Sequence, residues 1–144
     1  MAENTDWISI LIADDSKDDC HLLRRAFQEA KTPNRLDFVH DGQQLLDFLA
    51  AAQSLPGIIL LDLNMPRLDG KEALKAIRAD ARLSLLPVLI LSTSNYKDDV
   101  LACYRMGANA VMAKPLGYDE FVDLVFMVKR YWLEHVQLPA RFLA

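Results

Sequence analysis

Short apolar segments that end in polar residues most strongly constrain the fold of this chain. The clearest covers residues 58–61, which are apolar, end at Asp62 and lead into a loop containing Pro66 and Gly70. A run of this length is typical of a strand buried on both faces, as in a parallel sheet. Ligands of open α/β sheets bind at the carboxyl ends of strands, so Asp62 lies where functional residues are common. Taken alone, an Asp at such a place is more typical of a strand end or an ordinary turn.

The same pattern recurs four more times along the chain. Residues 7–13 end at Asp14 and Asp15, a second strand covers residues 36–39, and those at 88–91 and 110–113 follow the central one. Helical spacing of apolar residues separates the strands and ends with a long helix over about 118–136. Strand and helix therefore alternate five times. This order predicts an α/β fold with a doubly wound, five-stranded parallel sheet of order 2-1-3-4-5, with five helices on its two faces.

Composition excludes several classes of function. The 144 residues are enough for one domain, and a net charge of −4 without a basic stripe argues against binding to nucleic acid. The amino-terminal residues are polar and acidic, which argues against a signal peptide, and no apolar run is long enough to span a membrane. We therefore expect a cytoplasmic protein that keeps Cys20 and Cys103 reduced.

The predicted topology brings polar strand ends together. The switch point of the sheet lies between the first and third strands, so Asp14, Asp15 and Asp62 should share one rim. Three clustered carboxylates repel one another, and Mg²⁺ with oxygen ligands relieves that repulsion. The alternative is three solvated acids without a metal. Two further strands end at this rim in Ser92, Thr93 and Lys114. Carboxylates, hydroxyls, an ammonium group and Mg²⁺ together suit phosphoryl transfer, with Asp62 as the nucleophile.

These motifs, with LLDLNMPRLDG at residues 60–70, resemble the receiver domain of two-component response regulators. The resemblance covers residues 7–136 and implies a flavodoxin-like fold in which Asp62 accepts a phosphoryl group from a sensor histidine kinase. It also implies roles for the neighbouring residues, namely Mg²⁺ binding by Asp14, Asp15, Asp62 and the backbone carbonyl of Asn64, phosphoryl binding by Ser92, Thr93 and Lys114, and a cis peptide before Pro115.

Two positions bear on the output and on competing functions. Receivers often carry an aromatic switch residue three positions before the lysine, where this chain has Val111, so the form of signal relay does not follow from the sequence. Phosphatases of the haloacid dehalogenase type place a general acid two residues after the nucleophile, but Asn64 stands there and cannot supply a proton. A binding module that is never phosphorylated is the remaining alternative, although none of the acidic residues or the lysine is missing.

The carboxyl-terminal end carries more apolar residues than one helix face requires. One stripe, which includes Phe121 and Val125, is enough to dock the last helix on the sheet. A second apolar row on this helix and an apolar tail at residues 137–144, which follows the receiver domain at 1–136, together predict a homodimer interface. The residues assigned to this interface are Val122, Phe126, Leu133, Val136, Leu138, Phe142 and Leu143. The alternative is a tail that folds back on its own domain.

A finer resemblance supports that expectation. Residues 131–139 (YWLEHVQLP) are similar to the carboxyl-terminal end of single-domain regulators that pair with phytochrome histidine kinases. This resemblance implies a phytochrome kinase as phosphodonor and a two-fold homodimer. No output domain is expected in the eight residues after Val136, so we expect the output to be a protein contact or competition for the kinase.

Overall fold

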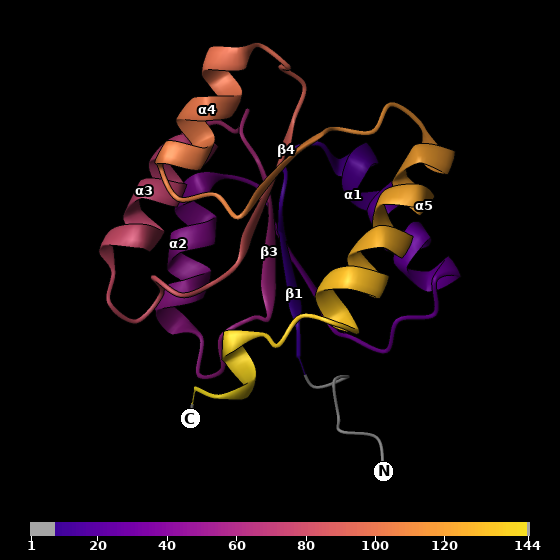
Figure 1. Cartoon of the computed structure of the whole chain (residues 1–144), viewed down its shortest axis with the longest axis horizontal. Coiled ribbons are helices and arrows are strands. Elements are labelled where there is room, and N and C mark those ends of the chain that lie inside the picture. The colour runs from indigo at the N-terminus through magenta and orange to yellow at the C-terminus, as the bar shows by residue number, and fades with distance from the viewer. Residues whose placement is uncertain (1–7, 144) are drawn as a thin grey trace.

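The computed structural model describes residues 8–143 and contains one parallel sheet of order β2-β1-β3-β4-β5, as the sequence predicts (Figure 1). The strands are β1 (Ile10–Ala13), β2 (Leu36–Val39), β3 (Ile58–Asp62), β4 (Val88–Ser92) and β5 (Ala110–Ala113). The helices are α1 (Lys17–Glu29), α2 (Gly42–Ala51), α3 (Gly70–Ala79), α4 (Lys97–Arg105) and α5 (Tyr118–Met127). The first strand was expected from Trp7, which lies outside the described residues.

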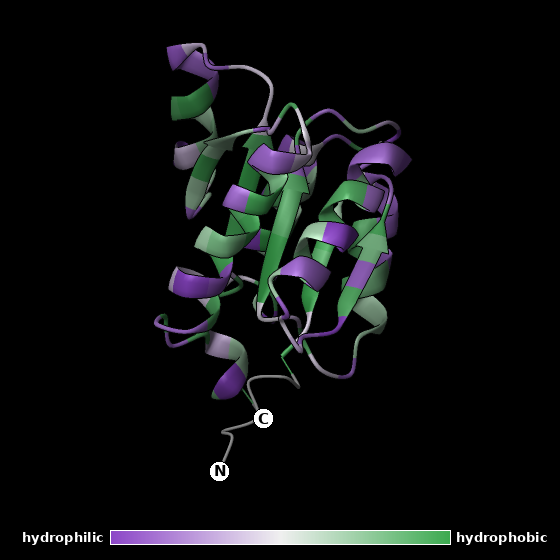
Figure 2. Ribbon diagram, turned by 90° about the vertical axis from the view of Figure 1, so that its right-hand side faces the viewer, coloured by the Kyte–Doolittle hydropathy of each residue, from purple (hydrophilic) through white to green (hydrophobic). Residues whose placement is uncertain are grey.

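The helices cover both faces of the sheet. Helices α1 and α5 lie on one face, and α2, α3 and α4 lie on the other (Figure 1). Every residue of β1, β3 and β4 is buried, and the strands in the middle of the sheet are predominantly apolar (Figure 2). The outer strands β2 and β5 are mostly half-buried. The three central strands thus hold the residues at their carboxyl ends in fixed register.

Side-chain caps fix where the helices next to this rim begin. The Ser16 hydroxyl accepts a hydrogen bond from the Asp19 backbone N–H at 3.1 Å, which caps α1. Asp41 caps α2 and Asp69 caps α3 in the same way. A capped first turn satisfies N–H groups that have no partner within the helix. The short loops between strand and helix are therefore held at both ends.

The last helix differs from its prediction as one continuous helix to about Val136. It is α-helical only as far as Met127 and continues as a π-helix, η2 (Val128–Leu133). A π-helix has wider turns and shifts the side chains that follow it. Here Val128 and Leu133 are both buried, and Lys129 Nζ donates to the carbonyl oxygen of Ala30 at 2.7 Å. The wider turn thus accompanies close packing against α1.

The tail folds back beneath the amino-terminal ends of the strands (Figure 1). Leu138 is 1% exposed and belongs to the same apolar cluster as Ile8, and a Cβ atom on Gly57 would lie 3.1 Å from its side chain. A 3₁₀ turn, η3 (Pro139–Arg141), follows. Leu133 and Leu138 therefore pack in the core of this chain, contrary to their assignment to a dimer interface. They cover apolar surface that the helices leave open.

The other predicted interface residues divide into two groups. Val122 and Val136 are half-buried against the same core. Phe126, Phe142 and Leu143 are exposed, by 44%, 70% and 44%.

Within the described part of the chain, no helix combines the length and apolar character needed to cross a membrane.

Candidate functional site

The acidic rim forms where β1 and β3 run side by side. Ala13 is in register with Leu61, so Asp14 and Asp62 follow at the same level of the sheet. One carboxylate oxygen from each of Asp14, Asp15 and Asp62 lies within 4.8 Å of the others. Asp14 and Asp62 are buried, whereas Asp15 is exposed. The structure thus brings together the three carboxylates that the sequence predicts.

Burial and mutual repulsion dominate the electrostatics of this rim. Burial, followed by the charge of Asp14, raises the pKa of Asp62 from 3.8 to about 6, although Lys114 opposes the shift. Asp14 Oδ2 is buried, and apart from an ion pair with Lys114 it has no hydrogen-bond partner among the described residues. Oxygen donors with unsatisfied negative charge suit a hard divalent cation. The residues present therefore fit a hard divalent metal ion.

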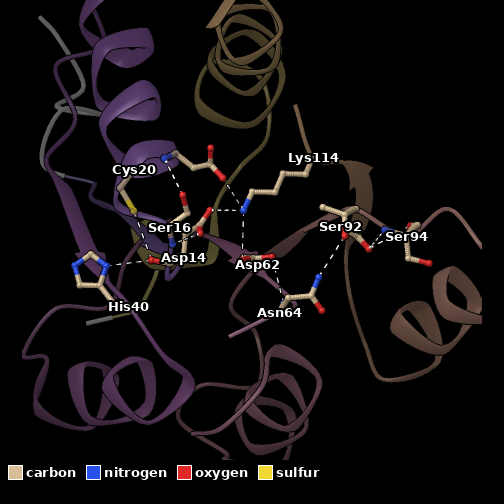
Figure 3. A network of polar contacts seen from close by, with 11 residues as sticks. Asp14, Ser16, Cys20, His40, Asp62, Asn64, Ser92, Ser94 and Lys114 are labelled. Atoms are coloured by element: carbon tan, nitrogen blue, oxygen red, sulfur yellow. Dashed lines mark hydrogen bonds and ion pairs between the residues drawn. The ribbon is translucent and has the colours of Figure 1, made fainter. Parts of the chain in front are cut away.

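Lys114 supplies the positive charge at the rim (Figure 3). Its Nζ atom lies 2.9 Å from Asp14 Oδ2, 3.0 Å from Asp19 Oδ2 and 3.4 Å from Asp62 Oδ2. Burial would lower the pKa of the ammonium group, but its close contacts to the Asp14 and Asp19 carboxylates and the negative charge of Asp14 and Asp62 raise it above its usual value. Lys114 is therefore a permanent cation shared among three carboxylates.

Asp19 is the member of this network that sequence reasoning missed. In the sequence it is one of two adjacent acidic residues, Asp18 and Asp19, near the start of a predicted helix. The spacing offered no signal, because Asp15 lies before the N-cap Ser16 and only Asp19 lies on a face of α1. Only the three-dimensional arrangement shows that this face meets Lys114, which is 95 residues away in sequence.

The hydroxyl groups lie beside the rim, but one of them is engaged elsewhere. Ser92 is buried, and its Oγ atom donates to the carbonyl oxygen of Ser94 at 3.2 Å and accepts from the Ser94 N–H at 3.1 Å (Figure 3). Thr93 accepts a hydrogen bond from the Asn64 side chain at 3.3 Å. The Asn64 N–H also contacts Asp62 Oδ1 at 3.3 Å. Both hydroxyls thus lie at the end of β4 and the start of the loop that follows it, and Thr93 contacts the loop that carries Asn64.

The turn that carries Asp14 is held by two side chains. The carbonyl oxygen of Asp14 lies 3.0 Å from His40 Nδ1 and accepts from Cys20 Sγ at 3.5 Å (Figure 3). Burial, followed by the charge of Asp14, raises the pKa of the Cys20 thiol to about 12. The thiol is therefore protonated at neutral pH and acts here as a packing and hydrogen-bonding group.

A second set of contacts fixes the loop after Asp62. The Arg67 guanidinium, in a residue with positive φ, contacts both carboxylate oxygens of Asp41, at 3.0 and 3.2 Å. The Gly42 N–H donates to the carbonyl oxygen of Leu68 at 3.0 Å. A two-point guanidinium–carboxylate contact of this kind restricts orientation as well as distance. The loop is thereby tied to the start of α2.

The cis peptide predicted before Pro115 is not observed, since the described residues contain no cis peptide bond. The trans form is the one that X–Pro bonds favour by about 0.5–1 kcal/mol. Lys114 reaches the three carboxylates from this trans backbone.

Comparison with known proteins identifies the family. A family model for the response regulator receiver domain matches residues 10–126. The chain belongs to this family. Phosphorylation and divalent-metal binding at the acidic pocket are features of receiver domains, and membership implies a sensor histidine kinase as partner.

The relatives include regulators of phytochrome signalling. Response regulator Rcp1 of Synechocystis is 34% identical over 136 residues, which cover 91% of this chain and 92% of that protein. A probable methanogenesis regulatory protein, FilR2 of Methanothrix harundinacea, is 35% identical over 137 residues, or 92% of this chain and 88% of that protein. The crystal structure of the phosphorylated cyanobacterial phytochrome response regulator RcpA superposes with a TM-score of 0.86 at 32% identity, covering 92% of this chain and 99% of that one. A Mn²⁺-bound structure of Rcp1 has a TM-score of 0.83 at 33% identity and covers 92% and 99%.

Proposed function

We propose that this chain is a response regulator that accepts a phosphoryl group on Asp62 from a sensor histidine kinase in a Mg²⁺-dependent reaction. The observation that carries the proposal is the arrangement of Asp14, Asp15 and Asp62 around a shared site, with Lys114 at the same rim. In this proposal Asp14, Asp15, Asp62 and the carbonyl of Asn64 hold the ion. It would neutralise charge on the carboxylates and on the transferred group.

The reaction assigns one task to each side chain. An ionised oxygen of Asp62 attacks phosphorus, forming an O–P bond while the P–N bond to the kinase histidine breaks and the electron pair returns to the imidazole. Lys114 already lies 3.4 Å from Asp62 and would pair with a phosphoryl oxygen. Ser92 would bind another oxygen only after its hydroxyl turns away from the Ser94 carbonyl. Thr93 and Asn64 border the same opening.

The site favours a lasting phosphoryl mark over rapid hydrolysis. Hydrolysis of the acyl phosphate is fastest with an acid or base near the attacking water. The residue two positions after Asp62 is Asn64, whose amide is engaged with Thr93 and cannot transfer a proton at neutral pH. A phosphatase of the haloacid dehalogenase type is the competing function, and fast steady-state turnover of a phosphomonoester would favour it instead.

Acetyl phosphate provides a direct test. Incubation with Mg²⁺ should add one phosphoryl group, measured by intact mass, and chelation of the metal should prevent it. Asp62→Asn should abolish the addition, whereas Asp18→Asn, at an exposed acidic position of α1, should retain it. No addition to the unaltered protein, or equal addition to Asp62→Asn, would contradict the proposal and favour a phosphorylation-independent module.

The proposed phosphodonor is a bacterial phytochrome kinase in the cytoplasm. Its support is the similarity to Rcp1 and RcpA, the latter described as a phytochrome response regulator. Phosphotransfer profiling against the sensor kinases of the same cell should show the fastest transfer from a phytochrome kinase. Preferential transfer from a kinase without a bilin-binding module would contradict this assignment and leave the receiver function intact.

The proposal also includes a homodimer through the last helix and tail. Its support is that Phe126, Phe142 and Leu143 remain exposed although neighbouring residues are buried. Phe126 borders a shallow apolar groove with Met127 and Tyr131 on α5 and η2. Light scattering should show a dimer that Phe126→Glu weakens, with Asp123→Glu as a control on the same helix. A monomer at micromolar concentration would exclude the dimer.

A further inference from the structure

The ammonium group of Lys114 lies closer to two of its three carboxylate partners than to the third, Asp62. Its distances to Asp14 and Asp19 are 2.9 and 3.0 Å, whereas Asp62 is 3.4 Å away. Asp14 belongs to the acidic rim, but Asp19 lies on the first turn of α1, outside the three clustered carboxylates. Asp19 therefore holds the ammonium toward α1.

The position of Asp19 is fixed by the helix start. Its backbone N–H donates to the Ser16 hydroxyl, and the Ser16 N–H donates to Asp14 Oδ1 at 2.9 Å. The Asp19 side chain is 27% exposed and that of Lys114 only 10%. An ion pair shielded to this degree is less screened than one in open solvent. Substitution of the Asp19 side chain leaves both backbone hydrogen bonds in place.

We propose that Asp19 is a positioning residue for phosphoryl acceptance, because it draws the Lys114 ammonium away from Asp62 and leaves the acidic rim free for a divalent cation. The inference rests on the proposed function. Without Asp19, the ammonium has only Asp14 and Asp62 as partners and closes on both. The ammonium then competes with the metal for the oxygens of Asp14 and Asp62. It also occupies the Asp62 oxygen that must attack phosphorus.

Charge balance leads to the same conclusion. Asp14, Asp15, Asp19 and Asp62 face one cation, Lys114, when all five side chains are ionised. Asp19 neutralises this cation without itself joining the cluster that would hold the metal. Without Asp19, the charge of Lys114 must be neutralised by Asp14 and Asp62 alone, which are also metal ligands in the proposed function.

The test compares two adjacent acids on the same helical turn. Asp19→Asn removes the charge with little change of shape, and Asp18→Asn makes the same change of net charge at an exposed position that forms no ion pair with Lys114 in the described structure. Mn²⁺ affinity, measured by electron paramagnetic resonance of the free ion, should fall about tenfold in Asp19→Asn. It should change little in Asp18→Asn.

Dependence on Lys114 separates positioning from a general structural effect. In a Lys114→Gln background, Asp19→Asn should cause little further loss of Mn²⁺ affinity, because the pair it controls is gone. Thermal melts identify any variant that fails to fold, and Asp19→Glu should recover part of the affinity. The Mg²⁺ concentration for half-maximal phosphorylation by acetyl phosphate should rise by the same factor as the Mn²⁺ dissociation constant.

Each outcome decides between the alternatives. An unchanged Mn²⁺ affinity in Asp19→Asn, or an equal loss in Asp18→Asn or in the Lys114→Gln background, would overturn the role of Asp19. Failure of acetyl phosphate to modify the unaltered protein would overturn the proposed function instead. The metal titration would still report on Asp19 in that case.

Discussion

The hydroxyl of Tyr104 on α4 accepts a hydrogen bond at 3.1 Å from the backbone N–H of Val111 on β5. Val111 occupies the position at which receivers often carry an aromatic switch residue, and β5 is an outer strand. An aromatic side chain therefore does reach this part of the sheet edge, but it comes from the neighbouring helix. The contact joins α4 to the strand that ends at Lys114.

Replacing Tyr104 by Phe should release the Val111 amide. The variant keeps the ring and loses one hydrogen bond, which costs about 0.5–1.5 kcal/mol. Exchange of the Val111 amide with deuterium should accelerate about tenfold when α4 no longer protects it. Tyr96→Phe, at a side chain that is 77% exposed, should leave this amide unchanged. Equal protection in both variants would show that Tyr104 does not tie α4 to β5.

The fold was predictable because its signals are local. Apolar runs such as residues 58–61 predict buried strands, and the alternation with helices predicts the order β2-β1-β3-β4-β5 that the structure confirms. The tail was not predictable in the same way. A surplus apolar row is consistent with an intermolecular interface and with packing on the same chain, and only the structure shows that Leu138 is buried next to Gly57.

The site was predictable where topology determines it. Asp14, Asp15, Asp62 and Lys114 meet because strand ends of one parallel sheet share a rim. The role of Asp19 and the engagement of Ser92 with Ser94 depend on side-chain directions that spacing does not specify. The departure from α-helix at Val128 likewise depends on tertiary packing.

Without metal, Asp62→Asn should stabilise the protein at neutral pH. Burial and the charge of Asp14 raise the pKa of Asp62 from 3.8 to about 6, so ionisation of this carboxyl costs the folded state free energy. The penalty is present above about pH 6 and disappears as the pH falls through 6 toward 3.8. Urea unfolding in a chelating buffer should show a gain of about 1–3 kcal/mol near pH 8.

Two conditions check the origin of this gain. It should shrink steadily below about pH 6, since Asp62 then becomes neutral in the unaltered protein as well. Saturating Mg²⁺ should reverse the order, because the ion stabilises only the form with all three carboxylates. A gain that is independent of pH would mean that ionisation of the buried Asp62 carboxyl is not its cause.

Gly42 should not tolerate a side chain. A Cβ atom there would lie 2.0 Å from the backbone oxygen of Leu68, in the loop that follows Asp62. Gly42→Ala must therefore displace this loop and weaken the Arg67–Asp41 pair, at a cost of about 2–3 kcal/mol in unfolding free energy. Gly117→Ala is the control, because its Cβ would approach only the flexible end of Glu120. Similar unfolding free energies for the two variants would show that the loop adapts.

Leu138→Ala should destabilise the isolated protomer, whereas Phe142→Ala should not. Leu138 is 1% exposed and lies against Ile8 and Gly57, so truncation leaves a cavity and costs about 2–4 kcal/mol. Phe142 is 70% exposed, and its truncation should change the unfolding free energy by less than about 0.5 kcal/mol. Urea unfolding at several protein concentrations separates this effect from dimerisation, because packing within one chain does not depend on concentration. A cost at Leu138 that grows with protein concentration would instead assign the tail to contacts between two chains.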